Sequence, residues 1–313
     1  MALLNGQPER YAVIDVGTNS IKFHVAERGG DRRFQTLADR AEVTRLGQGV
    51  DVAGEIVPEA LERAIVAIAG MAKEATSLGV RATAAVGTAG LRAASNREAV
   101  LEAIRNRTGV AIRVISGAEE GRLAYQAVEA GLGTTAGSLV VFDTGGGSSQ
   151  FTFGQDGQLI EQYSVPVGAV RFTERFGLAG TVTTAVLDES LAAIAAELSS
   201  LDGRPPPGAL VGMGGAITNI TAVRHAMAVY DASVVQGTVL ERSEIDRQIE
   251  IYRTRDADER RSIVGLQPKR AEVILAGACI VRTVMDKLGQ TSLTVSDRGL
   301  RHGVLAGWVG DQG

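Results

Sequence analysis

The sequence predicts an α/β fold made of two related halves, each a mixed sheet flanked by helices, with a cleft between them. A nine-residue pattern occurs twice, 128 positions apart, from Asp15 to Phe23 and from Asp143 to Phe151, with Asp, Gly, Ser and Phe in register. Each copy follows an apolar run and precedes an alternating run, which indicates strand, tight turn, strand. Helical and short apolar segments then alternate, which is typical of sheets covered by helices. Ligand clefts favour the boundary between two such halves.

In the first half, Pro58 stands near the start of a segment with apolar residues at helical spacing, which predicts a long helix. Ser95 followed by Glu98, and Ser116 followed by Glu119, match the capping box that opens a helix. The apolar runs between these segments are short enough to be strands. We therefore expect strands at residues 11–16, 21–27, about 34–39, 82–87 and 111–115, and helices at 58–77, from 95, and from 116 to about 130.

A small, polar, glycine-rich stretch at residues 131–137 marks the expected boundary between the halves. The order of elements then restarts with three strands followed by a helix. The two domains are expected at residues 1–130, joined by a closing helix at 300–313, and at residues 131–299. The second half should hold strands at 138–143, 149–154, 158–163, 210–213 and 291–295, and helices at about 184–200, after residue 215, and at 243–255 and 270–287, before the closing helix at 300–310.

Composition and charge exclude several classes of protein. The chain is 45% hydrophobic and 22% charged, with a net charge of −4, so it is not expected to bind DNA, and any polyanion site has to be local. The single cysteine, Cys279, excludes an internal disulfide and a multi-cysteine zinc site, and its apolar surroundings predict a buried thiol. The sequence shows neither a signal-peptide pattern nor an apolar stretch of membrane-spanning length. We therefore expect a cytoplasmic protein without a membrane partner.

The repeated hairpins carry groups suited to a phosphate chain. Glycine turns let backbone N–H groups approach phosphate oxygens, and hydroxyl and amide side chains add donors. Asp15 and Asp143 would repel phosphate directly, and they make sense as ligands of a hard cation such as Mg²⁺ that bridges to it. The alternative is two ordinary hairpins, which the duplication in register disfavours. The candidate phosphate-binding residues in the two turns are Gly17, Thr18, Asn19, Ser20, Gly145, Gly146, Gly147 and Ser148.

A second candidate group lies at the start of the helix that follows residue 116. If Glu119 makes the capping-box hydrogen bond, the side chain of Glu120 is available for another role at the N-terminus of the helix. A carboxylate there can accept a proton from an attacking water. Arg122 is a candidate phosphate ligand. The alternative is that both glutamates only stabilise the helix, through the favourable interaction of negative charge with the dipole at its N-terminus. Spacing alone leaves both interpretations open.

Two further segments join a buried strand to a helix. Thr88 and Arg92 follow the strand at 82–87, and both side chains are candidates for contact with phosphate, although a surface arginine on a turn is equally consistent with the sequence. Gly214 and Gly215 follow the strand at 210–213, where the amides of a helix N-terminus can face an anion or a nucleoside. A Gly-Gly turn alone is weak evidence for such a binding site, but its position within the repeated half strengthens that evidence.

Other chemistries find less support. The three histidines, His24, His225 and His302, show no metal-ligand spacing, which favours structural or surface roles. The sequence contains neither a Walker A loop nor a Gly-x-Ser-x-Gly elbow.

With these residues in view, the chain resembles the Ppx/GppA phosphatase family of exopolyphosphatases and guanosine pentaphosphate phosphohydrolases, within the actin-like ATPase superfamily. The Ser-Gly-x-Glu-Glu-x-Arg motif at residues 116–122 narrows the resemblance from superfamily to family. It implies two actin-like (ribonuclease H-like) domains. His302 stands where the family often has Glu, and longer members add a C-terminal helical region, so processive action on very long chains is not implied. The other matching segments are residues 15–20, 87–92, 142–148, 212–215 and 295–301.

The resemblance also implies the chemistry. Glu120 corresponds to the proposed base that activates water, and Asp143 to a residue near the catalytic metal, while Arg92, Asn19 and Ser20 lie among the residues around the phosphates. We expect a phosphoanhydride hydrolase, an exopolyphosphatase that releases orthophosphate from inorganic polyphosphate with Mg²⁺ or Mn²⁺. The candidate catalytic residues are Glu120, Asp143 and Arg92, and the candidate metal ligands are Asp143, Glu120 and Asp15.

Alternative functions remain open at this point. The substrate is inorganic polyphosphate or guanosine pentaphosphate (pppGpp), cleaved at its 5′ phosphate. A kinase or ATPase of the same superfamily, and a non-catalytic sensor that binds polyphosphate or an alarmone, are the competing classes. A homodimer is plausible from the family alone.

Overall fold

The computed structural model describes residues 9–29, 34–133 and 137–310. By their contacts they form two compact units, Met1–Ser116 with Leu300–Gly313, and Gly117–Gly299. The sequence placed the boundary at residues 131–137, of which 134–136 lie outside the described residues. The contacts instead place helix α5 (Gly117–Leu132) in the second unit, because it packs on strands β7 and β8 of that unit.

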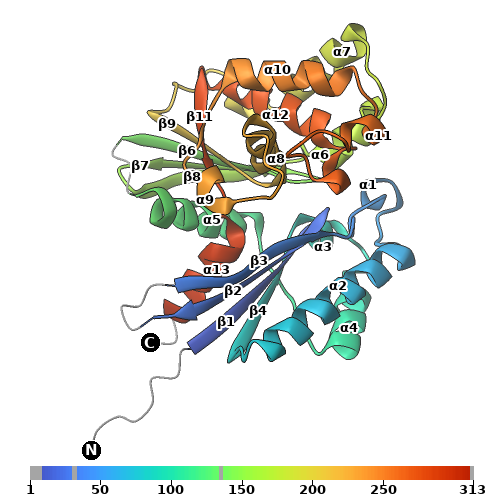
Figure 1. Ribbon diagram of the computed structural model, residues 1–313, viewed down its shortest axis with the longest axis vertical. Coiled ribbons are helices and arrows are strands. Elements are labelled where there is room, and N and C mark those ends of the chain that lie inside the picture. The colour runs from blue at the N-terminus through green and yellow to red at the C-terminus, as the bar shows by residue number, and fades with distance from the viewer. Residues whose placement is uncertain (1–8, 30–33, 134–136, 311–313) are drawn as a thin grey trace, which may run out of the picture. The chain divides into compact units, whose positions relative to one another are not determined.

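The first unit is built on a five-stranded sheet in the order β3-β2-β1-β4-β5. β1, β2 and β3 form an antiparallel meander, and β4 and β5 continue in parallel from β1. Helix α2 covers the face that carries Ile14 and Phe23, while α13 packs on β1 and β2 beside His24 of the other face (Figure 1). The strands are β1 (Glu9–Val16), β2 (Ser20–Arg28), β3 (Phe34–Val43), β4 (Ala82–Gly87) and β5 (Arg113–Val114), and the helices are α1 (Val50–Ala53), α2 (Pro58–Ser77), α3 (Ala89–Ala93), α4 (Arg97–Thr108) and α13 (Leu300–Gly310).

The second unit repeats this plan with one more strand, in the order β10-β11-β9-β6-β7-β8. β6, β7 and β8 form the meander, β9 and β11 run parallel to β6, and β10 closes the edge antiparallel to β11. The strands are β6 (Ser138–Thr144), β7 (Ser149–Gln155), β8 (Gln158–Val165), β9 (Ala209–Met213), β10 (Val239–Glu241) and β11 (Ser292–Ser296), and the remaining helices are α6 (Ala169–Phe176), α7 (Thr184–Glu197), α8 (Gly215–Arg224), α9 (Ala232–Val235), α10 (Arg242–Arg253), α11 (Ala257–Arg260) and α12 (Ile274–Lys287).

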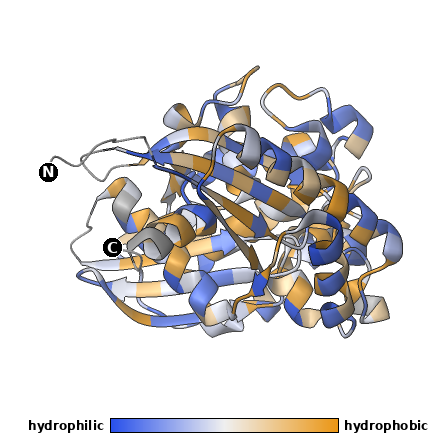
Figure 2. Ribbon diagram, turned by 90° about the horizontal axis from the view of Figure 1, so that it is seen from below, coloured by the Kyte–Doolittle hydropathy of each residue, from blue (hydrophilic) through white to orange (hydrophobic). Residues whose placement is uncertain are grey.

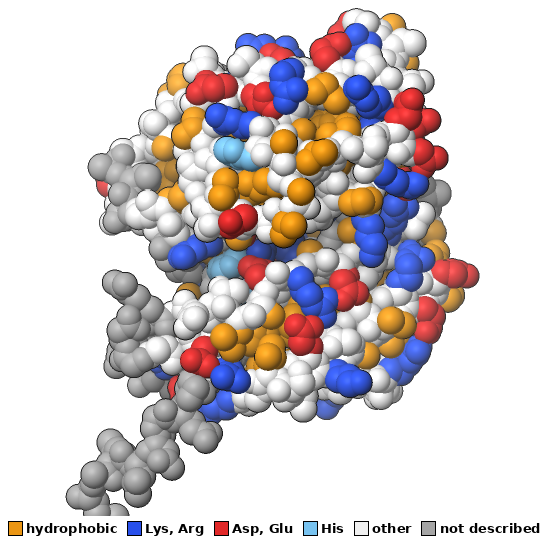
Figure 3. Space-filling model, viewed as in Figure 1, with side chains coloured by type: hydrophobic (Ala, Val, Ile, Leu, Met, Phe, Trp, Pro, Cys, Tyr) orange, Lys and Arg blue, Asp and Glu red, His pale blue; other side chains and the backbone are white. Residues whose placement is uncertain are grey.

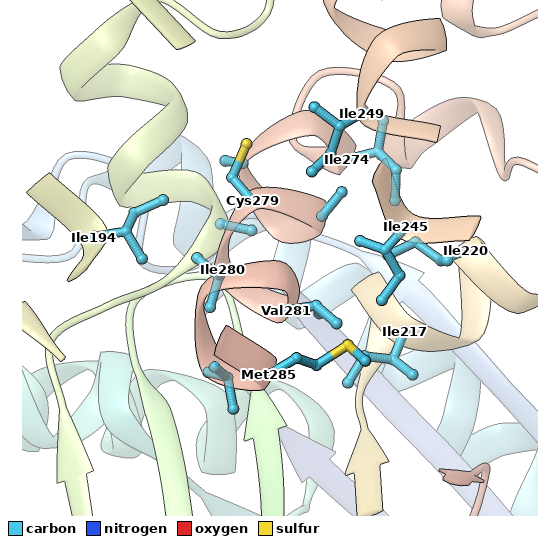
Figure 4. Packing of buried hydrophobic residues seen from close by; sticks show 14 of the residues in the cluster. Ile194, Ile217, Ile220, Ile245, Ile249, Ile274, Cys279, Ile280, Val281 and Met285 are labelled. Atoms are coloured by element: carbon cyan, nitrogen blue, oxygen red, sulfur yellow. The ribbon is translucent and has the colours of Figure 1, made fainter. Parts of the chain in front are cut away.

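Helix α12 lies at the centre of the second unit's core, between residues of α7, α8 and α10 such as Ile194, Ile217 and Ile249 (Figure 4). Cys279 on this helix is fully buried, as the sequence predicted, and burial raises the pKa of its thiol to about 12. Elsewhere, helices carry hydrophobic and hydrophilic residues on different sides, as expected of helices that cover a sheet (Figure 2).

The predicted α/β class, with a mixed sheet flanked by helices in each half, is confirmed. Two local details differ from expectation. The predicted capping box at Ser95 and Glu98 is wrong, because α4 begins at Arg97 with Asn96 as its N-cap, and the Ser95 hydroxyl donates to the carbonyl of Gly54 instead. Helices α1, α3, α6, α9 and α11 and strand β10 were not predicted, because each is no longer than eight residues and offers too short a window for an apolar pattern to be recognised.

No helix among the described residues is long and apolar enough to span a membrane. On the face shown in Figure 3, basic side chains are interspersed with acidic ones, in keeping with the small net charge. The net charge of the chain therefore provides no general attraction for a polyanion.

Candidate functional site

The first repeated turn, residues 17–20, joins β1 to β2. The Gly17 N–H donates to the Ser20 carbonyl at 3.1 Å, and a Cβ at Gly17 would lie 2.9 Å from that oxygen, so the turn favours glycine for lack of space. The carbonyl of Thr18 accepts from the N–H of Gly47 at 2.8 Å, and that of Asn19 from Arg45 at 2.9 Å. The loop after β3 therefore fixes the turn from one side.

Asp15 stands at the entrance to this turn and is only 4% exposed. It lies directly opposite Lys22 in the antiparallel register, with Oδ2 3.7 Å from Nζ. The ammonium group therefore balances much of the negative charge of this carboxylate.

The segment after β4 packs against the same turn. The N–H of Thr88 donates to the carbonyl of Val16 at 3.2 Å, and a Cβ at Gly90 would lie 3.2 Å from Oγ1 of Thr18. Arg92 donates from Nη1 to the carbonyl of Ile115 at 3.0 Å. The first unit thus brings Asp15, the turn and Thr88 together. Arg92 also lines a groove of about 440 Å³, together with Arg97, Glu98, Leu101, Val114, Ile115 and Ser116.

The second repeated turn, residues 145–148, joins β6 to β7 with the same geometry. The Gly145 N–H donates to the Ser148 carbonyl at 2.9 Å, and Asp143 lies opposite Gln150 as Asp15 lies opposite Lys22. The carbonyls of residues 145 and 146 accept from the first N–H groups of α6, each at 2.9 Å. The N-terminus of α6 therefore holds this turn in place.

Asp143 touches the start of helix α8. Gly214, the N-cap of that helix, has φ 93°, and a Cβ there would lie 2.2 Å from Oδ1 of Asp143. Both the left-handed backbone and the lack of space require glycine at this position. The carboxylate consequently lies next to the positive end of the α8 dipole, together with Gly215.

Arg270 belongs to this group of residues, although sequence reasoning missed it. A Cβ at Gly215 would lie 2.4 Å from its Nη2 atom. Burial lowers the pKa of the guanidinium, and the charge of Asp143 partly offsets that shift. Arg270 stands in a 3₁₀ turn (Pro268–Arg270) before α12, and no motif in the sequence marks it.

Glu120 lies in the first turn of α5, half-buried. This helix packs on the face of β6 that carries Leu139 and Val141, and by strand alternation Asp143 belongs to the same face.

The direction of α5 follows from its contacts with β7. Gly121 lies against Thr152, which pairs with Val141, and Tyr125 lies against Gly154, which pairs with Leu139. Helix α5 therefore runs antiparallel to β6, and its N-terminus points toward the end of β6 that bears Asp143.

Arg122, also on α5, has an exposed side chain. Its Nη1 donates to Oε1 of Gln126, one turn along the helix, at 3.2 Å. No contact with the second repeated turn is recorded for it among the described residues.

The three histidines lie in two different parts of the structure. The rings of His24 and His302 lie 4.5 Å apart in the first unit, and Asp39 lies beside both of them. His225, in the second unit, is exposed at the surface. The fold brings the other two together across 278 residues of sequence, which no spacing rule could detect.

Comparison with known proteins identifies the family. The model of the Ppx/GppA phosphatase family matches residues 24–312. This chain belongs to the Ppx/GppA phosphatase family. It is 28% identical to exopolyphosphatase 2 of Mycobacterium tuberculosis, over 96% of this chain and 99% of that one, and 28% identical to exopolyphosphatase 1 of Mycobacterium leprae, over 95% and 88%.

The fold agrees with this membership. The crystal structure of the Aquifex aeolicus Ppx/GppA family member superimposes with a TM-score of 0.82 at 31% identity, covering 97% of this chain and 99% of that chain. The chain is thus an enzyme of a hydrolytic family, as its motifs predicted.

Proposed function

We propose that this protein is an exopolyphosphatase, which hydrolyses the terminal phosphoanhydride of inorganic polyphosphate and releases orthophosphate. The observation that carries the proposal is the direction of α5, which puts the turn bearing Glu120 at the Asp143 end of β6. The names of the mycobacterial relatives support polyphosphate as the substrate.

In the proposed reaction, the residues of the second unit hold the terminal phosphate. The N–H groups of the second repeated turn and of the α8 N-terminus, with the guanidinium of Arg270, bind its oxygens. A water attacks the terminal phosphorus in line with the bridging oxygen that leaves, and Glu120 accepts the proton of that water. The bond between phosphorus and the bridging oxygen breaks, and the shortened chain departs. We propose that the first repeated turn, Thr88 and Arg92 bind phosphates as well.

The donor set around Asp143 fits a hard cation. The Asp143 carboxylate lies against a glycine whose missing Cβ leaves room for it, and Glu120 adds carboxylate oxygens at the same end of the sheet. Oxygen-only ligands of this kind suit Mg²⁺ or Mn²⁺. When bound, such an ion neutralises charge on the phosphoryl oxygens. Asp15 fits this role less well, because Lys22 already balances its charge.

The proposed base is tested by Glu120→Gln, with Glu119→Gln as the matched control on the same turn of α5. We expect Glu120→Gln to lower kcat for orthophosphate release from short polyphosphate by about 10²–10⁴-fold, while calorimetric binding of polyphosphate persists. Glu119→Gln should retain most of the activity. Full activity of Glu120→Gln would exclude it as the base.

Substrate choice is tested by measuring orthophosphate release from short polyphosphate, long polyphosphate, pppGpp and ATP in parallel. Turnover of polyphosphate with a higher kcat/KM than that of pppGpp is the expected result. A preference for pppGpp would assign the alternative activity of the family, and tight binding without turnover in the presence of Mg²⁺ would indicate a sensor.

A further inference from the structure

The first unit contains a compact cluster of two imidazoles and a carboxylate that the proposed phosphatase chemistry does not use. His24 lies in the middle of β2, directly opposite Asp39 of β3 in the antiparallel register. Helix α13 brings His302 onto the same pair. Two of the three histidines of the chain are therefore gathered around one carboxylate.

The donor atoms of this cluster have the spacing of a metal site. Nδ1 of His24 lies 3.5 Å from Oδ2 of Asp39, and Nε2 of His302 lies 3.4 Å from the same oxygen. All three atoms lie within 4.8 Å of one another. Ligands about 2.1 Å from a tetrahedral ion are about 3.4 Å apart, so an ion could contact all three donors with only small movements of the side chains.

An unsatisfied nitrogen gives independent support. The His24 side chain is 2% exposed, and its Nδ1 makes no hydrogen bond. Oδ2 of Asp39, 3.5 Å away, is too distant for a good hydrogen bond, and a metal ion between the two atoms would satisfy the buried nitrogen.

Arg301 holds the carboxylate in place through both of its oxygens. Its Nε donates to Oδ1 of Asp39 at 2.7 Å and its Nη2 to Oδ2 at 3.0 Å. Hydrogen bonds of this kind orient the carboxylate ligands of metal sites, although the positive charge of the guanidinium reduces affinity for a cation.

We propose that His24, Asp39 and His302 bind one divalent transition-metal ion of the Zn²⁺ type. Two imidazoles and one carboxylate favour such an ion over Mg²⁺, which prefers oxygen ligands. Three protein ligands leave a fourth position for water. The bound ion would join helix α13 to β2 and β3, and so fasten the end of the chain to the first sheet. This proposal is independent of the phosphatase proposal.

The test measures Zn²⁺ binding by calorimetry to the full chain, in excess Mg²⁺ so that oxygen-only sites are occupied. The variants are His302→Gln and Asp39→Asn, and the matched control is His225→Gln, which alters the exposed histidine of the second unit. We expect one equivalent of Zn²⁺ to bind the wild type and His225→Gln, and binding to weaken by about 10–100-fold in the other two variants. The thermal midpoint should rise with Zn²⁺ only in the proteins that bind it.

Co²⁺ supplies a second readout, because its visible absorption reports nitrogen and oxygen ligands directly. The wild type should develop a d–d band that His302→Gln lacks, and circular dichroism in metal-free buffer checks that each variant is folded. Absence of stoichiometric Zn²⁺ binding by the wild type would overturn the proposal. Wild-type affinity in folded His302→Gln and Asp39→Asn would overturn it equally.

Discussion

The two repeated turns have the same backbone and different surroundings. In both, the N–H of the glycine donates to the carbonyl of the serine three residues on, and the aspartate lies opposite the residue seven positions later. In the first unit that opposite residue is Lys22, an ammonium group beside Asp15. In the second unit it is Gln150, a neutral amide, which leaves Asp143 without a cation at the equivalent place.

This difference is the basis for the different roles that we propose for the two carboxylates. The charge of Asp15 is balanced inside the sheet, where the loop after β3 also fixes the turn. Asp143 instead lies against a glycine with positive φ at the start of α8, near Arg270. The same hairpin therefore recurs in the two units, and what differs is the set of residues that pack around it.

The largest expected effect tests the two aspartates against each other. Asp143→Asn should lower kcat for orthophosphate release by about 10²–10³-fold, because it removes the charged ligand next to the proposed scissile phosphate. Asp15→Asn should lower kcat less than about tenfold and should mainly reduce the thermal midpoint, because it leaves Lys22 without its carboxylate. Steady-state kinetics of both variants measure kcat, and thermal unfolding measures the midpoint. Equal losses of kcat would show that the turns are functionally equivalent.

A smaller effect tests the arginine that the sequence did not reveal. Arg270→Gln should lower kcat/KM for polyphosphate by about 10–100-fold, because the guanidinium fork beside Gly215 is lost. The control is Arg122→Gln, an exposed arginine of the same unit that is hydrogen-bonded to Gln126. The control should stay within about twofold of the wild type if exposed cations matter little. A control that loses as much as Arg270→Gln would point to general electrostatic attraction instead.

The sequence predicted the regular elements well where a pattern is local. Helix α2 begins at Pro58 and ends at Ser77, as its apolar spacing indicated, and β4 matches its predicted residues. The repeated turns were recognisable because their glycines and aspartates recur in register.

Local patterns in the sequence could not predict contacts between residues that lie far apart in the chain. Arg270 approaches Gly215 from a 3₁₀ turn, and His302 reaches His24 from the opposite end of the chain. Neither contact leaves a spacing in the sequence, because both depend on how helices pack on a sheet. The same holds for α5, which the sequence assigned to the first half and whose contacts place it in the second unit.

The smallest expected effect compares the two turn glycines. A Cβ at Gly17 would lie 2.9 Å from the backbone oxygen of Ser20, whereas one at Gly145 would lie 3.2 Å from that of Ser148. Neither glycine has a positive φ, so the difference is one of space alone. Replacing glycine by alanine also stabilises a protein by about 0.4–1 kcal/mol through the unfolded chain, which offsets part of any clash.

Gly17→Ala should therefore lower the free energy of unfolding by about 1–2 kcal/mol, and Gly145→Ala by less than about 1 kcal/mol, as measured by urea denaturation. Activity should show the reverse order, because the added methyl of Gly145→Ala stands on the turn proposed to hold the terminal phosphate. If Gly17→Ala lost more kcat than Gly145→Ala at a temperature where both are folded, the first turn would be the one nearer the reaction. That result would reverse the assignment of roles to the two hairpins.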